Sequence, residues 1–340
     1  MSEFVDHCKD LLSTLGLKGV AKKVYNRLNR VMGKVKARSI VSGPVKFKIP
    51  DRESNERIKY AYYANNQALV DVHYGAVLLL NLDDNSVAPT IMRTGWWEPW
   101  TDILINSIVK EGNITIDVGA NFGYHTLLQA KLVGTQGKVY AFECNPLLIP
   151  NLIRSAWISG FSGRIALHHA AVTDKMGEID IHFCRQQIGG GGIRVGAPTG
   201  PQYSFNEHGR VDWNTCWSEI EHVSVKTVGL DALLGQEIGE VDFIHTDAEG
   251  AEPLIFAGAK EIIKRSRHLK IITEWSIESA SEQDKPAHYQ MAKGLADEGF
   301  KFYLIKPPEQ DVYSFPPILK RMDLDEVMRL PHCDLFITRE

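Results

Sequence analysis

The sequence has few cysteines and no paired cysteine motif. Its 340 residues include five cysteines, an odd number, and no two of them form a C-x-x-C pair. That pattern argues against a disulfide framework and against a structural zinc site. The expected home of the chain is therefore a reducing cytosol.

Long apolar runs are also missing. No stretch approaches the roughly 20 apolar residues that a membrane-spanning helix requires, and the N-terminus lacks the basic and then apolar layout of a signal peptide. Hydrophobic residues make up 44% of the chain, which is enough for a sizeable core. One α/β domain with insertions can reach this length, and the lack of a spanning segment and of a signal peptide predicts a cytoplasmic protein.

A glycine is missing from the loop that follows Ile114–Val118. The β-branched residues of Ile114–Val118 predict a strand. The loop has Gly119 and Gly123 but lacks the middle glycine of the G-x-G-x-x-G pattern that binds dinucleotides. Asp117, just before the loop, would repel a diphosphate and attract a cationic amino-acid group. Glu143 ends the next expected strand, where a carboxylate can bind ribose hydroxyls. S-adenosylmethionine is therefore favoured over NAD, although a plain strand–turn–helix joint stays open.

Four sequence blocks carry a resemblance to a known family. They are Gly95-Trp96-Trp97-Glu98, Asp117–Thr126, Phe142–Pro146 and Val241–Glu252. With these blocks the chain, from about residue 95 to residue 269, resembles the FkbM-type methyltransferases, a branch of the class I S-adenosylmethionine-dependent enzymes. The family usually has proline at Cys144, lysine at His245 and an aliphatic residue at Thr246. These differences lie close to the expected reaction centre and leave the acceptor open.

The resemblance implies a Rossmann-like α/β fold with a seven-stranded, mostly parallel sheet, helices on both faces and a terminal antiparallel hairpin. Phe300–Ile305 and Cys333–Thr338 are the candidate strands of that hairpin. The expected cofactor-binding residues are Asp117, Gly119, Ala120, Asn121, Gly123, Tyr124, Thr126, Glu143, Asn145 and Asp247.

The order of predicted elements agrees with that fold. Strands are expected at Ala68–Leu82 with a turn near Gly75, and at Ile114–Val118, Val139–Glu143, Arg164–Ala171, Val241–Asp247 and Leu269–Glu274. Helices are expected at Pro150–Gly160 and Pro253–Arg267. Repeated strand–helix–strand units predict a largely parallel sheet with ligands at the carboxyl ends of its strands.

Charge divides the chain into parts. Through Lys48, eleven Lys and Arg residues face three acids, a net charge of +8, which leaves −12 on the rest. We expect residues 1–48 to form a basic helical extension, residues 49–112 a subdomain with a β-hairpin, and residues 113–340 the methyltransferase core. Two insertions are expected in the core, at 185–217 as a long loop or lid and at 307–330 with a weaker acceptor-binding role.

The basic extension has an amphipathic pattern. Val20, Val24, Leu28, Val31 and Val35 follow helical spacing beside a stripe of Lys and Arg. This helix is expected either to dock on the acidic body or to bind an anionic membrane surface or a glycan-assembly partner, whereas nucleic acid is not expected. A homo-oligomer stays open.

Methyl transfer to oxygen needs an in-line geometry and a base for the hydroxyl proton. The candidate catalytic residues are Asp247 at the end of its strand, His245 two residues earlier on the same strand face, and Glu274 at the end of the next strand. Asp247 and Glu274 are also the candidate ligands for a divalent cation such as Mg²⁺. The structural alternatives are a loop cap for Glu274 and a simple hydrogen-bonding role for His245.

Candidate acceptor contacts are Glu98, Glu249, Trp213 and Trp217. The resemblance implies methylation of a hydroxyl on a small molecule, most of all a sugar or glycan, with a secondary metabolite such as a polyketide as an alternative. An amine on a DNA base is disfavoured, because Asp247-Ala248-Glu249-Gly250 stands where such enzymes have an Asn/Asp-Pro-Pro-aromatic pattern. A non-catalytic scaffold of this fold, binding a membrane or partner, is a third hypothesis.

Overall fold

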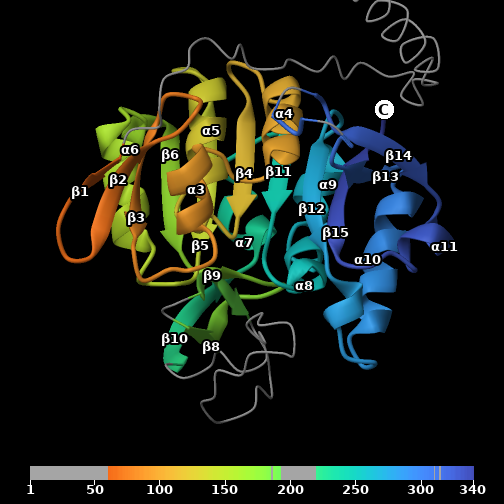
Figure 1. The fold of residues 1–340 in the computed structure, drawn as a ribbon. Helices are drawn as coiled ribbons and strands as arrows, with labels where there is room; N and C mark the ends of the chain where they lie inside the picture. The colour runs from red at the N-terminus through yellow and green to blue at the C-terminus, as the bar shows by residue number, and fades with distance from the viewer. Residues whose placement is uncertain (1–59, 185–186, 193–219, 310, 314) are drawn as a thin grey trace, which may run out of the picture. The chain divides into compact units, whose positions relative to one another are not determined.

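A computed structural model describes residues 60–184, 187–192, 220–309, 311–313 and 315–340 (Figure 1). The chain divides into two compact units, Met1–Pro44 and Val45–Glu340, and every described residue belongs to the second. The basic extension at 1–48, Trp213 and Trp217 lie outside the described residues. Within the described ranges, no helix has the length and apolar character that crossing a membrane requires.

The centre of the second unit is a sheet of eight strands. In spatial order they are β14 (Ile318–Met322), β13 (Lys301–Lys306), β15 (Cys333–Thr338), β12 (Lys270–Trp275), β11 (Phe243–Thr246), β4 (Ile114–Val118), β5 (Lys138–Glu143) and β6 (Ile165–His169). The five strands from β12 to β6 run parallel, so their carboxyl ends share one edge of the sheet.

The expected count of seven strands is wrong, and the additional strand comes from a segment expected to be an insertion. β15 pairs antiparallel with both β12 and β13, so the two predicted terminal strands are neighbours. However, β14 and the short helix α11 (Leu324–Val327) lie between them in sequence, and β14 extends the sheet beyond β13. The segment 307–330 is therefore partly a sheet edge, not only a loop beside the site.

Helices cover both faces of this sheet. On one face, Ile116, Ile244 and Ile271 pack with apolar residues of α7 (Leu230–Leu234), α8 (Glu252–Ala257), α9 (Lys260–Arg265) and α10 (Lys285–Asp297). The other face carries α4 (Pro99–Ile108), α5 (Tyr124–Leu132) and α6 (Ile149–Ile158). In sequence, α3 (Ala88–Thr94) precedes α4. The short 3₁₀ helices η1 (Ser162–Arg164) and η3 (Ile277–Ser279) follow α6 and β12. This three-layer arrangement is the one that the strand–helix alternation predicts.

The single helix expected at 253–267 is instead two helices, α8 and α9. The chain bends at Gly258, where a Cβ atom would lie 2.1 Å from the backbone oxygen of Thr173. A continuous helix would have to move this backbone away from the strand segment that follows β6, so the tertiary contact overrides the helical pattern of the sequence.

Two smaller sheets flank the central one. The expected hairpin near Gly75 is present as β2 (Gln67–Asp71) and β3 (Val77–Asn81), joined at their edge by β1 (Tyr60–Tyr62). The other sheet has the order β7 (Ala171–Val172), β10 (Ile220–Val228), β8 (Gly177–Cys184), β9 (Gln187–Gly192). The expectation of a loop from 185 onward is thus wrong for 187–192, where a glycine-rich stretch pairs with β8 as a strand.

Candidate functional site

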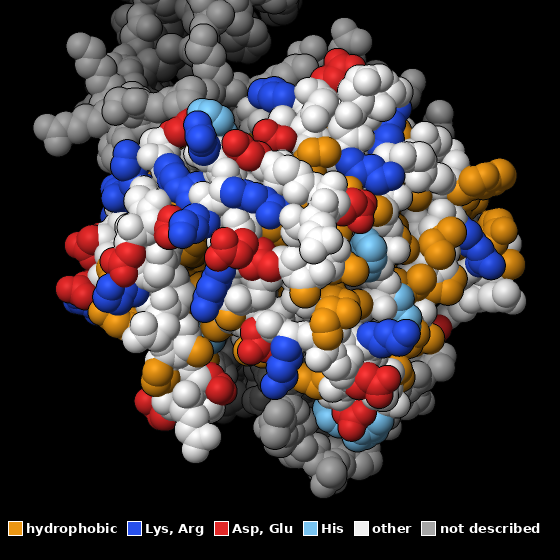
Figure 2. Space-filling model, turned by 180° about the vertical axis from the view of Figure 1, so that it is seen from behind, with side chains coloured by type: hydrophobic (Ala, Val, Ile, Leu, Met, Phe, Trp, Pro, Cys, Tyr) orange, Lys and Arg blue, Asp and Glu red, His pale blue; other side chains and the backbone are white. Residues whose placement is uncertain are grey.

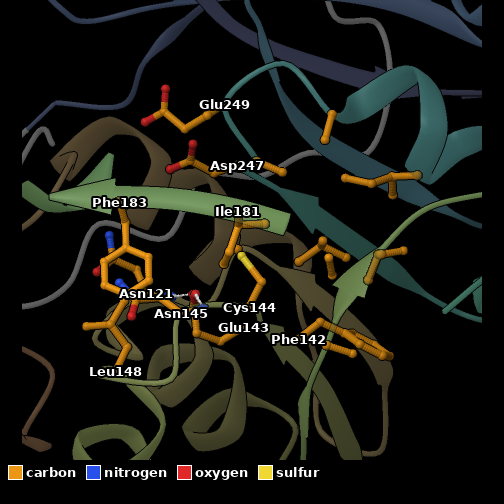
Figure 3. A pocket seen from close by; sticks show the side chains of 18 of the residues that line it. Asn121, Phe142, Glu143, Cys144, Asn145, Leu148, Ile181, Phe183, Asp247 and Glu249 are labelled. Atoms are coloured by element: carbon orange, nitrogen blue, oxygen red, sulfur yellow. Dashed lines mark hydrogen bonds between the residues drawn. The ribbon is translucent and has the colours of Figure 1, made fainter. Parts of the chain in front are cut away.

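A pocket opens at the carboxyl ends of β4, β5 and β11, where the parallel strands place their following loops. Its polar wall holds five of the predicted residues: Asn121, Glu143, Asn145, Asp247 and Glu249 (Figure 3). Its apolar wall includes Leu148 of the helical side and Ile181, Phe183 and Ile188 of the flanking sheet.

Glu143 is the central polar residue of this pocket. Its Oε2 accepts a hydrogen bond from the backbone N–H of Asn121 at 2.7 Å, and its Oε1 accepts one from the backbone N–H of Asn145 at 2.7 Å. Burial raises the pKa of Glu143, although these backbone donors lower it in part. Since each carboxylate oxygen has a second lone pair, Glu143 can still accept hydrogen bonds from two ribose hydroxyls.

The conformation of the glycine loop is fixed by packing within the protein. Gly119 has φ +82°, and a Cβ there would lie 1.8 Å from the backbone oxygen of Asp247. Gly123 has φ +88°, and its Cβ would lie 2.8 Å from Cγ of Leu152. Glycine at these positions therefore lets the β4–α5 loop press against the β11–α8 loop and α6, which shapes the pocket between them.

Asp117 and His245 form a buried pair behind the pocket. They are register partners on β4 and β11, and His245 Nδ1 lies 2.7 Å from Asp117 Oδ1. The hydroxyl of Thr126 donates to the other carboxylate oxygen. Asp117, Ala120, Gly123, Tyr124 and Thr126 do not line the pocket, so their direct contact with a cofactor stays a prediction.

The pair has a defined electrostatic character. Burial would raise the pKa of Asp117, but the hydrogen bond and charge of His245 outweigh burial and lower it. Conversely, burial would lower the pKa of His245, and Asp117 outweighs that effect and raises it. An ionised Asp117 accepts the Nδ1–H of His245, which leaves Nε2 as the basic nitrogen of the neutral ring. Nε2 makes no hydrogen bond to a described residue.

A second buried aspartate, Asp102 on α4, was missed in the sequence analysis. Its Oδ2 accepts from the Tyr124 hydroxyl at 2.6 Å and lies 2.6 Å from Nε2 of His73, while Nε2 of His125 is 3.4 Å from its Oδ1. The rings of His125 and His245 lie edge to face, 4.8 Å between centroids. The available signal was a single acid among the apolar residues of the α4 sequence.

The predicted carboxylates Asp247 and Glu274 belong to a group of acids at the strand ends. Burial and the charges of neighbouring acids raise the pKa of Asp247 to about 7 and that of Glu274 to about 11. Glu274 Oε2 accepts from the backbone N–H of Glu249 at 3.1 Å, and Oε1 lies 3.2 Å from Nε2 of the exposed His332. The raised pKa favours the protonated form of Glu274, and its hydrogen bond to Glu249 agrees with the alternative in which it caps a loop; its role as a base stays a prediction.

No group of three or more His, Cys, Asp or Glu side chains with metal-binding geometry is present within the described ranges. Glu98, the other predicted acceptor contact, caps α4 in the left-handed region with φ 46°. Burial and the charges of Asp334, Asp247 and Asp102 raise its pKa well above the usual range. Glu98 therefore belongs to the same acidic edge as Asp247.

The neighbouring Trp96 is held in a stack. The rings of Trp96 and His73 lie parallel, 3.2 Å between centroids, and Tyr313 from the segment 307–330 approaches Trp96 edge to face at 5.5 Å. Through His73 this stack is connected to Asp102. Residues from both the N-terminal hairpin and the C-terminal segment thus meet at the strand ends.

The strand order of the central sheet is that of class I methyltransferases. A pocket with an acid at the end of β5 is typical of the same class. The methyltransferase FkbM domain matches residues 117–302, which is more than half of the chain. The protein belongs to the FkbM methyltransferase family, and the family and fold support an S-adenosylmethionine-dependent methyltransferase. No curated protein matches the sequence.

Solved structures of methyltransferases are distantly similar. The O-methyltransferase from Bacillus cereus in complex with SAH is 12% identical, with 72% of this chain and 80% of that chain covered and a TM-score of 0.40. Methyltransferase FkbM from Methylobacillus flagellatus KT is 13% identical, with 67% and 43% covered and a TM-score of 0.36. Identity and TM-score are low in both cases, so the family match alone places the chain.

Proposed function

We propose that this protein transfers a methyl group from S-adenosylmethionine to a hydroxyl of a sugar or glycan, with His245 as the base. The observation that carries the proposal is the buried Asp117–His245 pair. Asp117 directly precedes Val118 and Gly119 of the pocket wall, and Asp247 of the wall lies two residues after His245. These neighbours support a base close to the cofactor pocket.

The pocket residues fit the cofactor. Glu143 suits the ribose hydroxyls, and Ile181, Phe183 and Leu148 offer an apolar surface for the adenine ring. Asp247 and Glu249 offer carboxyl oxygens that can accept hydrogen bonds from the ammonium group of the amino-acid part of the cofactor. When bound, S-adenosylmethionine supplies a methyl group on a sulfonium centre that an oxygen nucleophile can displace.

His245 has the features of a general base. Asp117 holds Nδ1–H, so the lone pair of Nε2 is directed away from the pair and can accept the proton of an acceptor hydroxyl. The resulting imidazolium is stabilised by the charge of Asp117, 2.7 Å away. The family usually has lysine at this position, and histidine has the lower ordinary pKa of the two.

A polyhydroxylated acceptor agrees with the acidic edge of the site. Glu98, Asp247 and Glu249 all offer carboxyl oxygens, which accept hydrogen bonds from sugar hydroxyls. Stacking of the acceptor on Trp213 or Trp217 stays a prediction, because both lie outside the described residues. Binding of the basic extension to a membrane or a glycan-assembly partner also stays a prediction, because residues 1–48 lie outside the described residues.

The test is a methylation screen with labelled S-adenosylmethionine over sugar nucleotides and oligosaccharides, with and without Mg²⁺ and chelator. His245→Gln should lose roughly 10²–10⁴-fold in turnover and keep its affinity for the demethylated cofactor. His222→Gln, at an exposed histidine of β10, is the control and should match the wild type. Full turnover by His245→Gln would show that another group accepts the proton, and methylation of amines but not hydroxyls would refute the acceptor class.

A further inference from the structure

The outer face of α6 exposes three large apolar side chains. Trp157 is 75% exposed, Ile153 is 54% exposed and Ile158 is 41% exposed. Ile153 and Trp157 are four residues apart, so they lie on the same side of the helix one turn from each other. Single exposed apolar residues are common, but a tryptophan with two isoleucines on one short helix forms a patch.

The orientation of α6 is fixed by polar contacts on its inner face. Ser155 Oγ accepts a hydrogen bond from the backbone N–H of Leu79 at 2.8 Å, and Ser159 Oγ accepts one from Val77 at 2.9 Å. These bonds satisfy the free edge of β3. The serines are thus turned inward together with the buried Leu152 and Ala156, and the tryptophan is turned outward. Rotating the helix to bury Trp157 would leave the edge of β3 without partners.

The helix and the segments next to it in sequence carry positive charge, whereas the exposed Asp71 pairs with Val77 of β3, the strand that Ser159 contacts. No Asp or Glu occurs from Cys144 to Thr173, a stretch that covers α6, η1 and β6, and it contains Arg154 and Arg164. Arg154, beside Ile153, is exposed. Figure 2, seen from behind, shows hydrophobic side chains gathered along the right-hand edge of the molecule, the side on which α6 and β1–β3 lie.

We propose that the outer face of α6 is a membrane-contact surface that places Trp157 and Ile153 in the headgroup region of an anionic bilayer. Tryptophan is well suited to this region because it has a large apolar ring with a polar N–H at its edge. The exposed Arg154 complements anionic lipid, and α6 itself carries no carboxylate that would repel it.

The size of the patch favours a lipid surface over a second copy of the chain. From the exposed fractions of the three side chains, the patch amounts to roughly 400 Å² of accessible area. A stable protein interface needs about 800 Å² on each partner. A peripheral membrane contact needs only a few inserted side chains supported by cations.

Binding through this face would leave the cofactor pocket open. Leu148, just before α6, lines the pocket, whereas Trp157 lies near the other end of the helix. Nine residues of helix separate them by about 13 Å. The surface is thus distinct from the proposed active site, and its role does not depend on the acceptor that is methylated there.

The experiment uses the full chain with vesicles of phosphatidylcholine, with and without phosphatidylglycerol. The variant Ile153→Ser/Trp157→Ser should bind anionic vesicles about tenfold or more weakly in co-sedimentation, because two inserted apolar side chains are lost. The control Met176→Ser/Ile318→Ser removes two side chains that are 60% and 52% exposed elsewhere, and it should bind like the wild type. Thermal unfolding of each variant should be unchanged, since the replaced side chains lie in solvent.

Insertion itself is measured by tryptophan fluorescence with brominated lipids, which separates this surface from any contribution of the basic N-terminus. Wild-type fluorescence should be quenched in anionic vesicles, and Trp157→Phe should lose that quenching. The proposal is overturned if quenching persists in Trp157→Phe, or if the double variant binds vesicles like the wild type. A wild-type dimer that the double variant converts to monomer, with vesicle binding unaffected, would assign the patch to a second copy instead.

Discussion

Replacing Asp117 by Asn tests whether this carboxylate positions the base or binds the cofactor. The substitution keeps the size of the side chain and removes the charge that holds Nδ1–H of His245. Asp117 and His245 are 1% and 5% exposed, and the bond between them is 2.7 Å long. In this buried pair the asparagine amide can also donate to Nδ1 of His245. The proton of the neutral ring then lies on Nε2, which removes the lone pair that would accept the proton of the acceptor.

The size of the effect follows from this geometry. A hydrogen bond to a charged group contributes about 1.5–3 kcal/mol, and one pKa unit corresponds to about 1.4 kcal/mol. The pKa of His245, which Asp117 raises, should therefore fall. Because the base works in its neutral form, the acid limb of the pH–rate profile should move to lower pH. The rate at the plateau should fall roughly 10²–10⁴-fold, as expected for the loss of a correctly oriented base.

The assay combines single-turnover methylation over a range of pH with calorimetric titration of the demethylated cofactor. Its affinity should change little, because Asp117 does not line the pocket. Asp297→Asn, which removes an exposed ion pair with Lys293, is the control and should behave like the wild type. If affinity falls as far as the rate while the acid limb stays in place, Asp117 is a cofactor ligand and the proposed role of the pair is refuted.

Three further predictions concern the pocket and its surroundings. Glu143→Gln should weaken binding of the demethylated cofactor by about 1.5–3 kcal/mol, and unchanged affinity by calorimetry would mean that the ribose binds elsewhere. Gly119→Ala should lower the unfolding free energy by more than about 3 kcal/mol, because its Cβ would meet a backbone oxygen at 1.8 Å. Gly160→Ala, with φ +73° but nothing within 4 Å, should cost only about 1–2 kcal/mol, and equal melting temperatures would contradict the packing argument. Glu274→Gln and chelator should each leave the rate unaltered. The folded pKa of Glu274 is raised to about 11, so the free energy of unfolding of the wild type should fall as pH rises from about 4.5 to about 11. The Gln variant should lack this contribution to the pH dependence of stability. Denaturation at several pH values measures the difference.

Most strands could be inferred from the sequence, because each is a short apolar run next to a turn. The predicted strands Ile114–Val118 and Val139–Glu143 are confirmed as β4 and, with Lys138 added, as β5, and both predicted terminal strands are present. The errors lie where local pattern and tertiary contact disagree. The glycine-rich stretch 187–192 has little intrinsic strand character, and it becomes β9 because β8 offers an edge to pair with.

The same distinction applies to the site. The sequence by itself determined the loop chemistry: a glycine turn between an aspartate and a helix, and a glutamate at the end of the next strand, which together indicate a nucleoside cofactor. Only the tertiary structure decided that Asp117 pairs with His245, since 128 residues separate them and the match depends on the register of β4 and β11. Likewise, the raised pKa of Glu274 depends on burial beside other acids, and burial and neighbouring charge are properties of the folded chain that no local spacing encodes.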